Sequence, residues 1–356
     1  MIKYKVIGIM SGTSLDGLDI ACCEFYKNKS WRYKIIHAET KKYNNNWKKK
    51  LSNAFKMKRM NLNALNIEYG NYIGKEILKF IKQQKFSPDL ISSHGHTVFH
   101  QPEIKLTLQI GDGKTISSVC NLPVVCDFRS GDVALGGQGA PLVPIADKLL
   151  FSDFDFCLNL GGIANISFDN KRKERIAFDI CPVNIVLNTL ANKLGKEFDK
   201  NGKIASKGKI NYQLLSKLND LSFYTIKPPK SLGREWIEKH FFPILNSFNI
   251  SIQDKLRTVT EHIAIQISSA VNPKSEIRNP KLLITGGGAY NSFLIERIAS
   301  LLKIKIVLPE DKIIQFKEAL AFALLGVLKI RKEINCLKSV TGAKRNSSGG
   351  RIFFTY

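Results

Sequence analysis

Runs of apolar residues separated by turns of small and polar residues begin close to the start of the chain. Val6–Met10 and Leu18–Cys23 are two such runs, and they enclose the turn Ser11–Gly17. A strand, a small-residue turn and a second strand predict a β-hairpin rather than the strand-to-helix turn of a P-loop. The alternative for the turn itself is a plain tight hairpin closed by Asx and Ser/Thr turns.

The residues that follow predict an α/β domain around this hairpin. Apolar residues at helical spacing indicate a long amphipathic helix from Leu62 to about Lys85. Short apolar runs before and after it predict strands at Trp31–Glu39, Leu90-Ile91, Leu106–Ile110 and Pro123–Cys126.

A second strand, glycine turn and strand opens the middle of the chain. Phe156–Leu160, Gly161-Gly162 and Ile163–Phe168 repeat the first pattern, and a strand ending on Asp179 follows. Farther on, a strand at Leu282–Ile284 runs into Gly286–Gly288, and residues 318–330 form an almost wholly apolar helix. The two hairpins suggest a duplicated architecture, with one domain of residues 1–128 plus 335–356 and another of residues 129–334.

Composition supports a folded protein of two domains. The chain has 356 residues, of which 44% are hydrophobic, and this is too long for one core of usual size. Its seven cysteines have no framework spacing, so we expect a reduced, cytoplasmic protein, and no apolar run is long enough to span a membrane. The net charge of +24 comes mostly from dispersed lysines, which argues against nucleic-acid binding and favours anionic substrates such as ATP.

The three glycine-bearing turns suggest a nucleotide site. Uncovered backbone N–H groups bind phosphate oxygens, and carboxylates such as Asp16 and Asp19 hold Mg²⁺ directly or through water. The two hairpins would face each other across a triphosphate in a cleft between the domains, and Gly286–Gly288 would lie under the adenosine. This pattern resembles the sugar kinase/Hsp70/actin superfamily, whose two-domain actin-like ATPase fold consists of duplicated ribonuclease H-like domains.

Within that superfamily the chain resembles the anhydro-N-acetylmuramic acid kinase family over its full length. The residues that carry the resemblance are GIMSGTSLDGLD (8–19), SHGHTVFHQP (93–102), LQIGDG (108–113), DFRSGDVALGGQGAPLVPIAD (127–147), NLGGIANIS (159–167), FDICPVN (178–184), TGGGAYN (285–291) and EALAFALLG (318–326). The 127–147 run is long and highly specific.

The resemblance implies an enzyme that opens the 1,6-anhydro ring of its sugar with water and phosphorylates the freed O6 from ATP, in peptidoglycan recycling. Asp179 matches the catalytic base, Asp16 is the expected ligand of Mg²⁺, and the sugar-binding candidates are His96, Thr97, Arg129 and Glu318. The nucleotide-binding residues expected are Ser11, Gly12, Thr13, Ser14, Asp16, Gly17, Asp19, Gly161, Gly162, Gly286, Gly287, Gly288 and Asn291. A homodimer is expected by the same resemblance.

Simpler roles compete with several of these assignments. Asp179 is also placed to cap a helix, Arg129 to form an inter-domain ion pair, and Glu318 to sit at a helix N-terminus. The spacing of His94, His96 and His100 is compatible with zinc, although no cysteine accompanies them.

The chain also departs from the family pattern. Asp179-Ile180-Cys181-Pro182 replaces the expected Asp-Thr-Gly-Pro, Val183 and Asn188 replace a small residue and an acid, and His96 replaces Gln. Since the added bulk of Ile180 and Cys181 bears on sugar selection, a kinase for another anhydro sugar such as levoglucosan and a non-catalytic ATP-binding protein remain alternatives.

Overall fold

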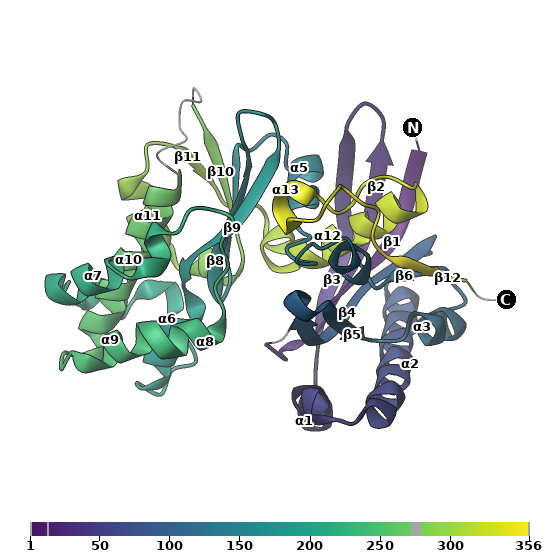
Figure 1. Cartoon of the computed structure of the whole chain (residues 1–356), viewed down its shortest axis with the longest axis horizontal. Helices are drawn as coiled ribbons and strands as arrows, with labels where there is room; N and C mark the ends of the chain where they lie inside the picture. The colour runs from purple at the N-terminus through teal and green to yellow at the C-terminus, as the bar shows by residue number, and fades with distance from the viewer. Residues whose placement is uncertain (1, 13, 272–278, 355–356) are drawn as a thin grey trace. The chain divides into compact units, whose positions relative to one another are not determined.

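A computed structural model describes residues 2–12, 14–271 and 279–354 (Figure 1). The chain packs into two compact units, with unit 1 comprising Met1–Phe151 and Phe316–Tyr356 and unit 2 comprising Ser152–Gln315. Within the described residues, no helix combines the length and the apolar character needed to cross a membrane.

Unit 1 is built on a sheet in the order β12-β6-β4-β1-β2-β3, with β5 paired to β4. Neighbours pair antiparallel from β1 to β3, whereas β4 is parallel to β1 and β6 is parallel to β4. The strands are β1 (Ile2–Ser11), β2 (Gly17–Lys27), β3 (Trp31–Lys42), β4 (Leu90–Gln101), β5 (Leu106–Ile110), β6 (Val124–Cys126) and β12 (Arg351–Phe353).

Helices cover the sheet of unit 1. Buried residues of β1 and β2, such as Ile7 and Ile20, share one hydrophobic cluster with Tyr69 and Ile73 of α2 and Ile116 of α3. The helices and short 3₁₀ turns of this unit are α1 (Asn45–Asn53), η1 (Ala54–Lys56), α2 (Arg59–Gln84), η2 (Pro102–Ile104), α3 (Gly113–Cys120), α4 (Ser130–Ala134), α5 (Pro144–Leu150) and α13 (Lys338–Thr341).

Helix α12 (Asp311–Ile330) packs directly against β1 and β4 of unit 1. It has non-helical backbone at Phe316, which is also where unit 1 resumes. A Cβ added to Gly8 would lie 2.1 Å from the carbonyl oxygen of Ala319, so only glycine lets strand and helix approach so closely. The Ser92 hydroxyl donates to the carbonyl of Phe322 from the neighbouring strand.

Unit 2 repeats the strand arrangement of unit 1. Its sheet has the order β11-β10-β7-β8-β9, in which β7, β8 and β9 pair antiparallel and β10 and β11 continue parallel to β7. The strands are β7 (Phe156–Leu160), β8 (Ile163–Asp169), β9 (Arg175–Pro182), β10 (Lys281–Thr285) and β11 (Lys305–Val307). Both sheets therefore follow the meander-then-parallel order expected for duplicated ribonuclease H-like domains, and the prediction of a mixed α/β chain with a repeated fold is confirmed.

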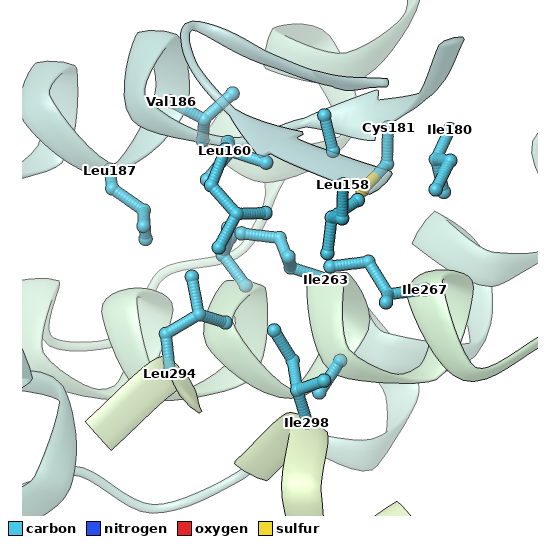
Figure 2. Close-up of a cluster of buried hydrophobic side chains, with 14 of the residues drawn as sticks. Leu158, Leu160, Ile180, Cys181, Val186, Leu187, Ile263, Ile267, Leu294 and Ile298 are labelled. Atoms are coloured by element: carbon cyan, nitrogen blue, oxygen red, sulfur yellow. The ribbon is translucent and has the colours of Figure 1, made fainter. Parts of the chain in front are cut away.

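The core of unit 2 lies between this sheet and its helices. Figure 2 shows Leu158, Leu160 and Cys181 of the sheet facing Ile263 and Ile267 of α10. The helical segments are α6 (Asn184–Asn192), η3 (Lys200–Gly202), η4 (Ala205–Lys207), α7 (Tyr212–Asn219), η5 (Ser222–Thr225), α8 (Arg234–Trp236), the π-helical η6 (Ile237–Phe241), α9 (Phe242–Ser247), α10 (Ile252–Val271), η8 (Gly287–Tyr290) and α11 (Ser292–Leu301).

The limits of the two units differ from those predicted from the sequence. Residues 129–151 and 316–334, expected in the second domain, belong to unit 1. Buried contacts explain this placement, because the Lys317 Nζ lies 3.1 Å from the Asp147 Oδ1 and the Thr341 hydroxyl donates to the Asp132 carboxylate at 2.8 Å. The return of the C-terminal segment to the first domain agrees with the sequence analysis.

Candidate functional site

The predicted hairpin between β1 and β2 is present, and buried side-chain contacts hold the end of β1 next to its turn. Ser11 is only 1% exposed, and its hydroxyl lies 2.8 Å from the Tyr43 hydroxyl and 3.1 Å from the His96 Nδ1. Ser11 and His96, predicted to bind different ligands, are thus joined in one buried network. Thr13, another predicted nucleotide ligand, lies outside the described residues.

The backbone of Gly12 has open space on the side where a Cβ would lie. The nearest described atom to a Cβ added there is the Ser14 Oγ, at 3.5 Å. Neither packing nor a left-handed backbone therefore requires glycine at this position, and the free space fits a ligand that approaches the backbone closely. Gly17, in contrast, is required by packing, because its Cβ would meet the Lys41 carbonyl oxygen at 2.6 Å.

Carboxylates gather near the hairpin within unit 1. Burial, together with the charges of Glu318 and Asp16, raises the pKa of Asp19 to about 6, while the hydrogen bond from Thr40 lowers it. Carboxylates close to one another favour a nearby cation. The described residues contain no cluster of three or more His, Cys, Asp or Glu side chains arranged as a metal cage. The donor set therefore fits Mg²⁺ that keeps waters and phosphate oxygens as ligands.

Arg129 is held by His94 within unit 1. The Arg129 Nε and Nη2 lie 3.0 and 2.8 Å from the His94 Nε2, and its Nη1 donates to the Gly139 carbonyl at 2.7 Å. Burial and the Arg129 charge lower the pKa of His94, and its Nδ1 lies 3.0 Å from the Gly95 carbonyl. We therefore assign a neutral imidazole that donates from Nδ1 and accepts at Nε2, which orients the guanidinium.

The other histidines of the 93–102 motif have separate partners. His96 faces Ser11, and His100 lies 3.2 Å from the Thr107 hydroxyl. Burial lowers the pKa of His96 to about 4, so it is neutral at physiological pH. Within the described residues, these three imidazoles are not part of any group of three or more His, Cys, Asp or Glu side chains that could hold a metal ion.

A polar cavity of about 330 Å³ lies in unit 1, and it is lined by His94, the partner of Arg129, but not by Arg129 itself. It opens among β4, β5, the end of β6 and β12. Its polar lining includes side chains to which the sequence analysis gave no sugar-binding role: His94, Thr107, Gln109, Asp112, Asp127 and Ser130. Hydroxyl, amide and carboxylate groups together are what a sugar needs for orientation. Thr97 and Glu318 are half-buried and exposed, respectively, and do not line this cavity.

Asp179 lies in a row of polar residues across the sheet of unit 2. Its directly opposed partner on β8 is Asn165, whose own partner on β7 is Asn159. Opposed residues of neighbouring strands point to the same face of a sheet, about 5 Å apart at Cβ. Asn165 is exposed, whereas Leu158, Leu160 and Ile166 of the same strands are buried in the core. The row therefore lies on the face opposite the core.

The environment of Asp179 is not that of a helix cap. Helix α6 is preceded by Val183 at its N-cap, and Asp179 lies inside β9. Burial raises the pKa of Asp179, and hydrogen bonds from Leu232 and Ser231 lower it. The capping alternative is therefore wrong. The alternative for Glu318 agrees with the structure, because the non-helical backbone at Phe316 divides α12 and Glu318 lies at the start of the second helical part.

A β-bulge removes the apparent conflict between Ile180-Cys181 and a sugar site. Asn165 pairs with Asp179 and Ala164 with Cys181, so Ile180 is an extra residue in β9. As a result both Ile180 and Cys181 are buried in the unit 2 core, 3% and 0% exposed (Figure 2). Their bulk points away from the face that carries Asp179, contrary to the expectation that it would alter sugar contacts.

The two glycine turns of unit 2 lie together at the end of β7. Thr285 of β10 is the register partner of Asn159, and Gly286 has φ 83°, with its position for a Cβ 2.6 Å from the Asn159 Oδ1. Gly287 is exposed, and the nearest atom to a Cβ added there is the Asn184 Nδ2 at 3.8 Å, whereas a Cβ on Gly161 would lie 3.2 Å from the Asn159 Nδ2. Asn291 has a structural role, since its Oδ1 accepts from the Leu294 N–H and caps α11.

Comparison with known proteins identifies the family. Residues 4–355 match the family model described as anhydro-N-acetylmuramic acid kinase. The chain belongs to the anhydro-N-acetylmuramic acid kinase family. Relatives with that name include one from Francisella tularensis subsp. novicida (strain U112), 37% identical over 99% of this chain and 100% of the relative, and one from Bacillus cereus (strain G9842), 34% identical over 98% and 99%.

Solved structures are more distant from this family member. One is titled activator of the 2-hydroxyisocaproyl-CoA dehydratase from Clostridium difficile with bound ADPNP; it is 13% identical, covers 92% of this chain and 96% of its own, and has a TM-score of 0.46. A hexokinase from Schistosoma mansoni complexed with glucose has a TM-score of 0.38 at 10% identity, covering 91% of this chain and 85% of its own. At these TM-scores the likeness carries no argument about a ligand.

Proposed function

We propose that this chain is an ATP-dependent anhydro-N-acetylmuramic acid kinase. It opens the 1,6-anhydro ring of its sugar with water and transfers the γ-phosphoryl group of ATP to the freed O6, which gives N-acetylmuramic acid 6-phosphate for peptidoglycan recycling. Membership of the family over nearly the whole chain carries this proposal. The ribonuclease H-like order of both sheets supports it, because it brings the motif residues to sheet edges and faces where ligands can reach them.

Asp179 is the residue we propose as general base. Water must lose a proton as it attacks the anomeric carbon, and a carboxylate is the usual acceptor in glycosidic hydrolysis. Asp179 lies on a polar sheet face beside the exposed Asn165, and hydrogen bonds from Ser231 and Leu232 oppose the effect of burial on its pKa. These contacts favour the ionised form that a base needs.

The nucleotide contacts belong to the glycine turns of each unit. In unit 1, Gly12 and Ser14 would offer backbone N–H groups, and Asp16 and Asp19 would hold Mg²⁺ through water. In unit 2, Gly161, Gly162 and Gly287 would offer backbone N–H groups, whereas the Gly286 N–H already donates to the Ile314 carbonyl at 3.3 Å. Bound Mg²⁺ would neutralise phosphate charge, which is the main requirement of phosphoryl transfer. Two of the predicted nucleotide ligands have protein partners of their own. The Ser11 hydroxyl contacts two side chains, and Asn291 caps a helix.

The sugar contacts that we propose centre on Arg129. Burial lowers its pKa only to about 10, so its guanidinium keeps its charge at neutral pH and suits the lactyl carboxylate. The polar cavity lined by His94, Asp127 and Ser130 is a candidate for the sugar hydroxyls, although Arg129 itself does not line it. Thr97 and Glu318 stay candidates, whereas His96 acts through Ser11 rather than on the sugar, because it is only 4% exposed.

The proposal also covers the cellular compartment and the oligomeric state of the protein. Seven buried thiols fit a reducing, cytoplasmic environment, and a homodimer is the expected assembly. Another anhydro sugar, such as levoglucosan, lacks the carboxylate that Arg129 would bind, so a strong preference for the acidic sugar separates the two substrates.

Product analysis tests the function. Purified protein is incubated with ATP, Mg²⁺ and 1,6-anhydro-N-acetylmuramic acid, and the product is read by mass spectrometry in water and in ¹⁸O-labelled water. We expect the mass of the substrate plus one phosphoryl group (HPO₃) plus one water, with one ¹⁸O incorporated at the anomeric carbon. A phosphorylated product without added water contradicts the hydrolytic step, and turnover of levoglucosan alone contradicts the choice of sugar.

A further inference from the structure

The segment Lys230–Leu232 holds Asp179 at two points. The Asp179 N–H donates to the Lys230 carbonyl at 3.1 Å, and the Leu232 N–H donates to the Asp179 Oδ2 at 2.8 Å. Ser231 lies between these two contacts, and its side chain acts with the Leu232 N–H to lower the pKa of the Asp179 carboxylate. This segment lies far from β9 in sequence, yet it fixes both the backbone and the side chain of the same residue.

The segment is itself anchored. The Lys230 Nζ donates to the Phe223 carbonyl at 3.0 Å and lies 4.4 Å from the centre of the Phe223 ring. At the other end, the Leu232 side chain is 6% exposed, and Phe223 is 3% exposed. Ser231 lies between two anchors with its own side chain exposed. Its hydroxyl is therefore held at a defined place even though it contributes nothing to the core.

We propose that Ser231 and Lys230 are positioning residues for the reaction, acting through the Asp179 carboxylate. Ser231 fixes the orientation of that carboxylate together with the Leu232 amide, and Lys230 fixes the segment that carries both donors. The proposal rests on the proposed role of Asp179 as general base. A base must be aimed at its water as well as ionised, and misplacement by about 1 Å can cost 10²-fold in rate.

The contacts of Ser231 and Leu232 affect the pKa of Asp179 as well as its orientation. Burial alone raises the pKa of Asp179, and the donors Leu232 and Ser231 lower it by binding the charged form. The charged or titratable groups on the packed elements, Lys230 on the segment and Arg175 and Cys181 on β9, are not among the causes of that shift within the described residues. Loss of the Ser231 hydroxyl therefore moves the titration of Asp179 to higher pH.

Two serine variants and a matched control test the role of Ser231. Ser231→Ala removes the hydroxyl, Ser231→Thr keeps it, and Ser222→Ala removes an exposed hydroxyl of η5 that makes no hydrogen bond in the described part of the chain. Titration is followed by carboxyl ¹³C NMR, with the Asp179 signal assigned by its loss in Asp179→Asn. We expect a higher midpoint in Ser231→Ala alone, and an unchanged midpoint would overturn the proposal.

Activity provides the second readout. In Ser231→Ala we expect kcat to fall about 5- to 50-fold with little change in KM, and the acid limb of the pH profile to move to higher pH; Ser231→Thr restores both. If the wild-type protein does not turn over the sugar, the proposed function fails while the NMR titration still decides this inference. If the wild type is active and the Ser231→Ala profile is unchanged, this inference alone fails.

A lysine pair tests the anchor. Lys230→Met keeps the aliphatic stem but removes the donor to the Phe223 carbonyl, and Lys227→Met changes an exposed lysine of the same loop. Amide exchange of Leu232 should accelerate in Lys230→Met and not in Lys227→Met. Equal exchange in both variants contradicts the anchoring role.

Discussion

His96 makes a testable contribution to the pH dependence of stability. Its ring is 4% exposed, with Nδ1 3.1 Å from the Ser11 hydroxyl and the Tyr69 ring at its edge. Burial lowers its pKa from 6.5 to about 4, so the folded protein holds the neutral form while the unfolded chain binds a proton more readily. The contribution is fully present above about pH 6.5 and is lost as the pH falls toward 4.

The size of this effect follows from the shift. A difference of one pKa unit corresponds to about 1.4 kcal/mol, so the full loss below pH 4 is about 3.4 kcal/mol. At pH 5 only the unfolded chain is substantially protonated at this site, and the loss is about 2 kcal/mol. His96→Gln removes the titrating group but keeps an amide that can donate to Ser11, so it abolishes this part of the pH dependence.

Urea unfolding at pH 8 and pH 5 measures the effect. We expect His96→Gln to be within about 1 kcal/mol of the wild type at pH 8 and to lose about 2 kcal/mol less between pH 8 and pH 5. The buried His94 and His262 titrate in both proteins, so only the difference between them reports on His96. His240→Gln, at an exposed position, is the control. An identical pH dependence in His96→Gln and wild type refutes the assignment of a buried neutral imidazole.

Three further substitutions probe the base, a buried ion pair and a close approach. Asp179→Asn should lower kcat by about 10²–10⁴-fold with the fold retained, as measured by turnover and circular dichroism, and near-normal turnover removes Asp179 from its role. Asp147→Ala removes the buried carboxylate that lies 3.1 Å from the Lys317 ammonium and should lower the free energy of unfolding by about 3–5 kcal/mol in urea titration; a loss under 1 kcal/mol contradicts that reasoning. Gly8→Val forces a side chain into the Ala319 carbonyl and should abolish soluble expression or cost more than about 3 kcal/mol, whereas Gly131→Ala, with no described atom within 4 Å of the new Cβ, should be tolerated.

Local patterns were sufficient to predict most strands and helices. The hairpin at β1 and β2 and its counterpart at β7 and β8 each combine apolar runs with a turn of small residues, and both form where expected. Helix α2 follows the spacing of its buried residues from Leu62 to Phe80. In these segments the residues that set the period also make the contacts, so the sequence contains the information directly.

Contacts between distant segments could not be predicted in the same way. The sequence analysis ended the first domain at residue 128, because nothing local shows that Lys317 meets Asp147 or that Gly8 lies against α12. The partners of Asp179 were missed for the same reason, since Ser231 and Leu232 lie in a loop without regular periodicity. Asn165 carried a usable signal, because it alternates with the buried Ala164 and Ile166 in a strand next to the one that holds Asp179.

The bulge in β9 shows why a departure from a family motif must be located before its effect is judged. In a regular strand Asp179 and Cys181 would point to the same face, and a larger residue after the base would crowd the sugar. The extra residue in β9 reverses that relation, so Cys181 points into the core together with Ile180. Ile180 and Cys181 therefore fill the interior of unit 2, and their side chains point away from the face that carries Asp179.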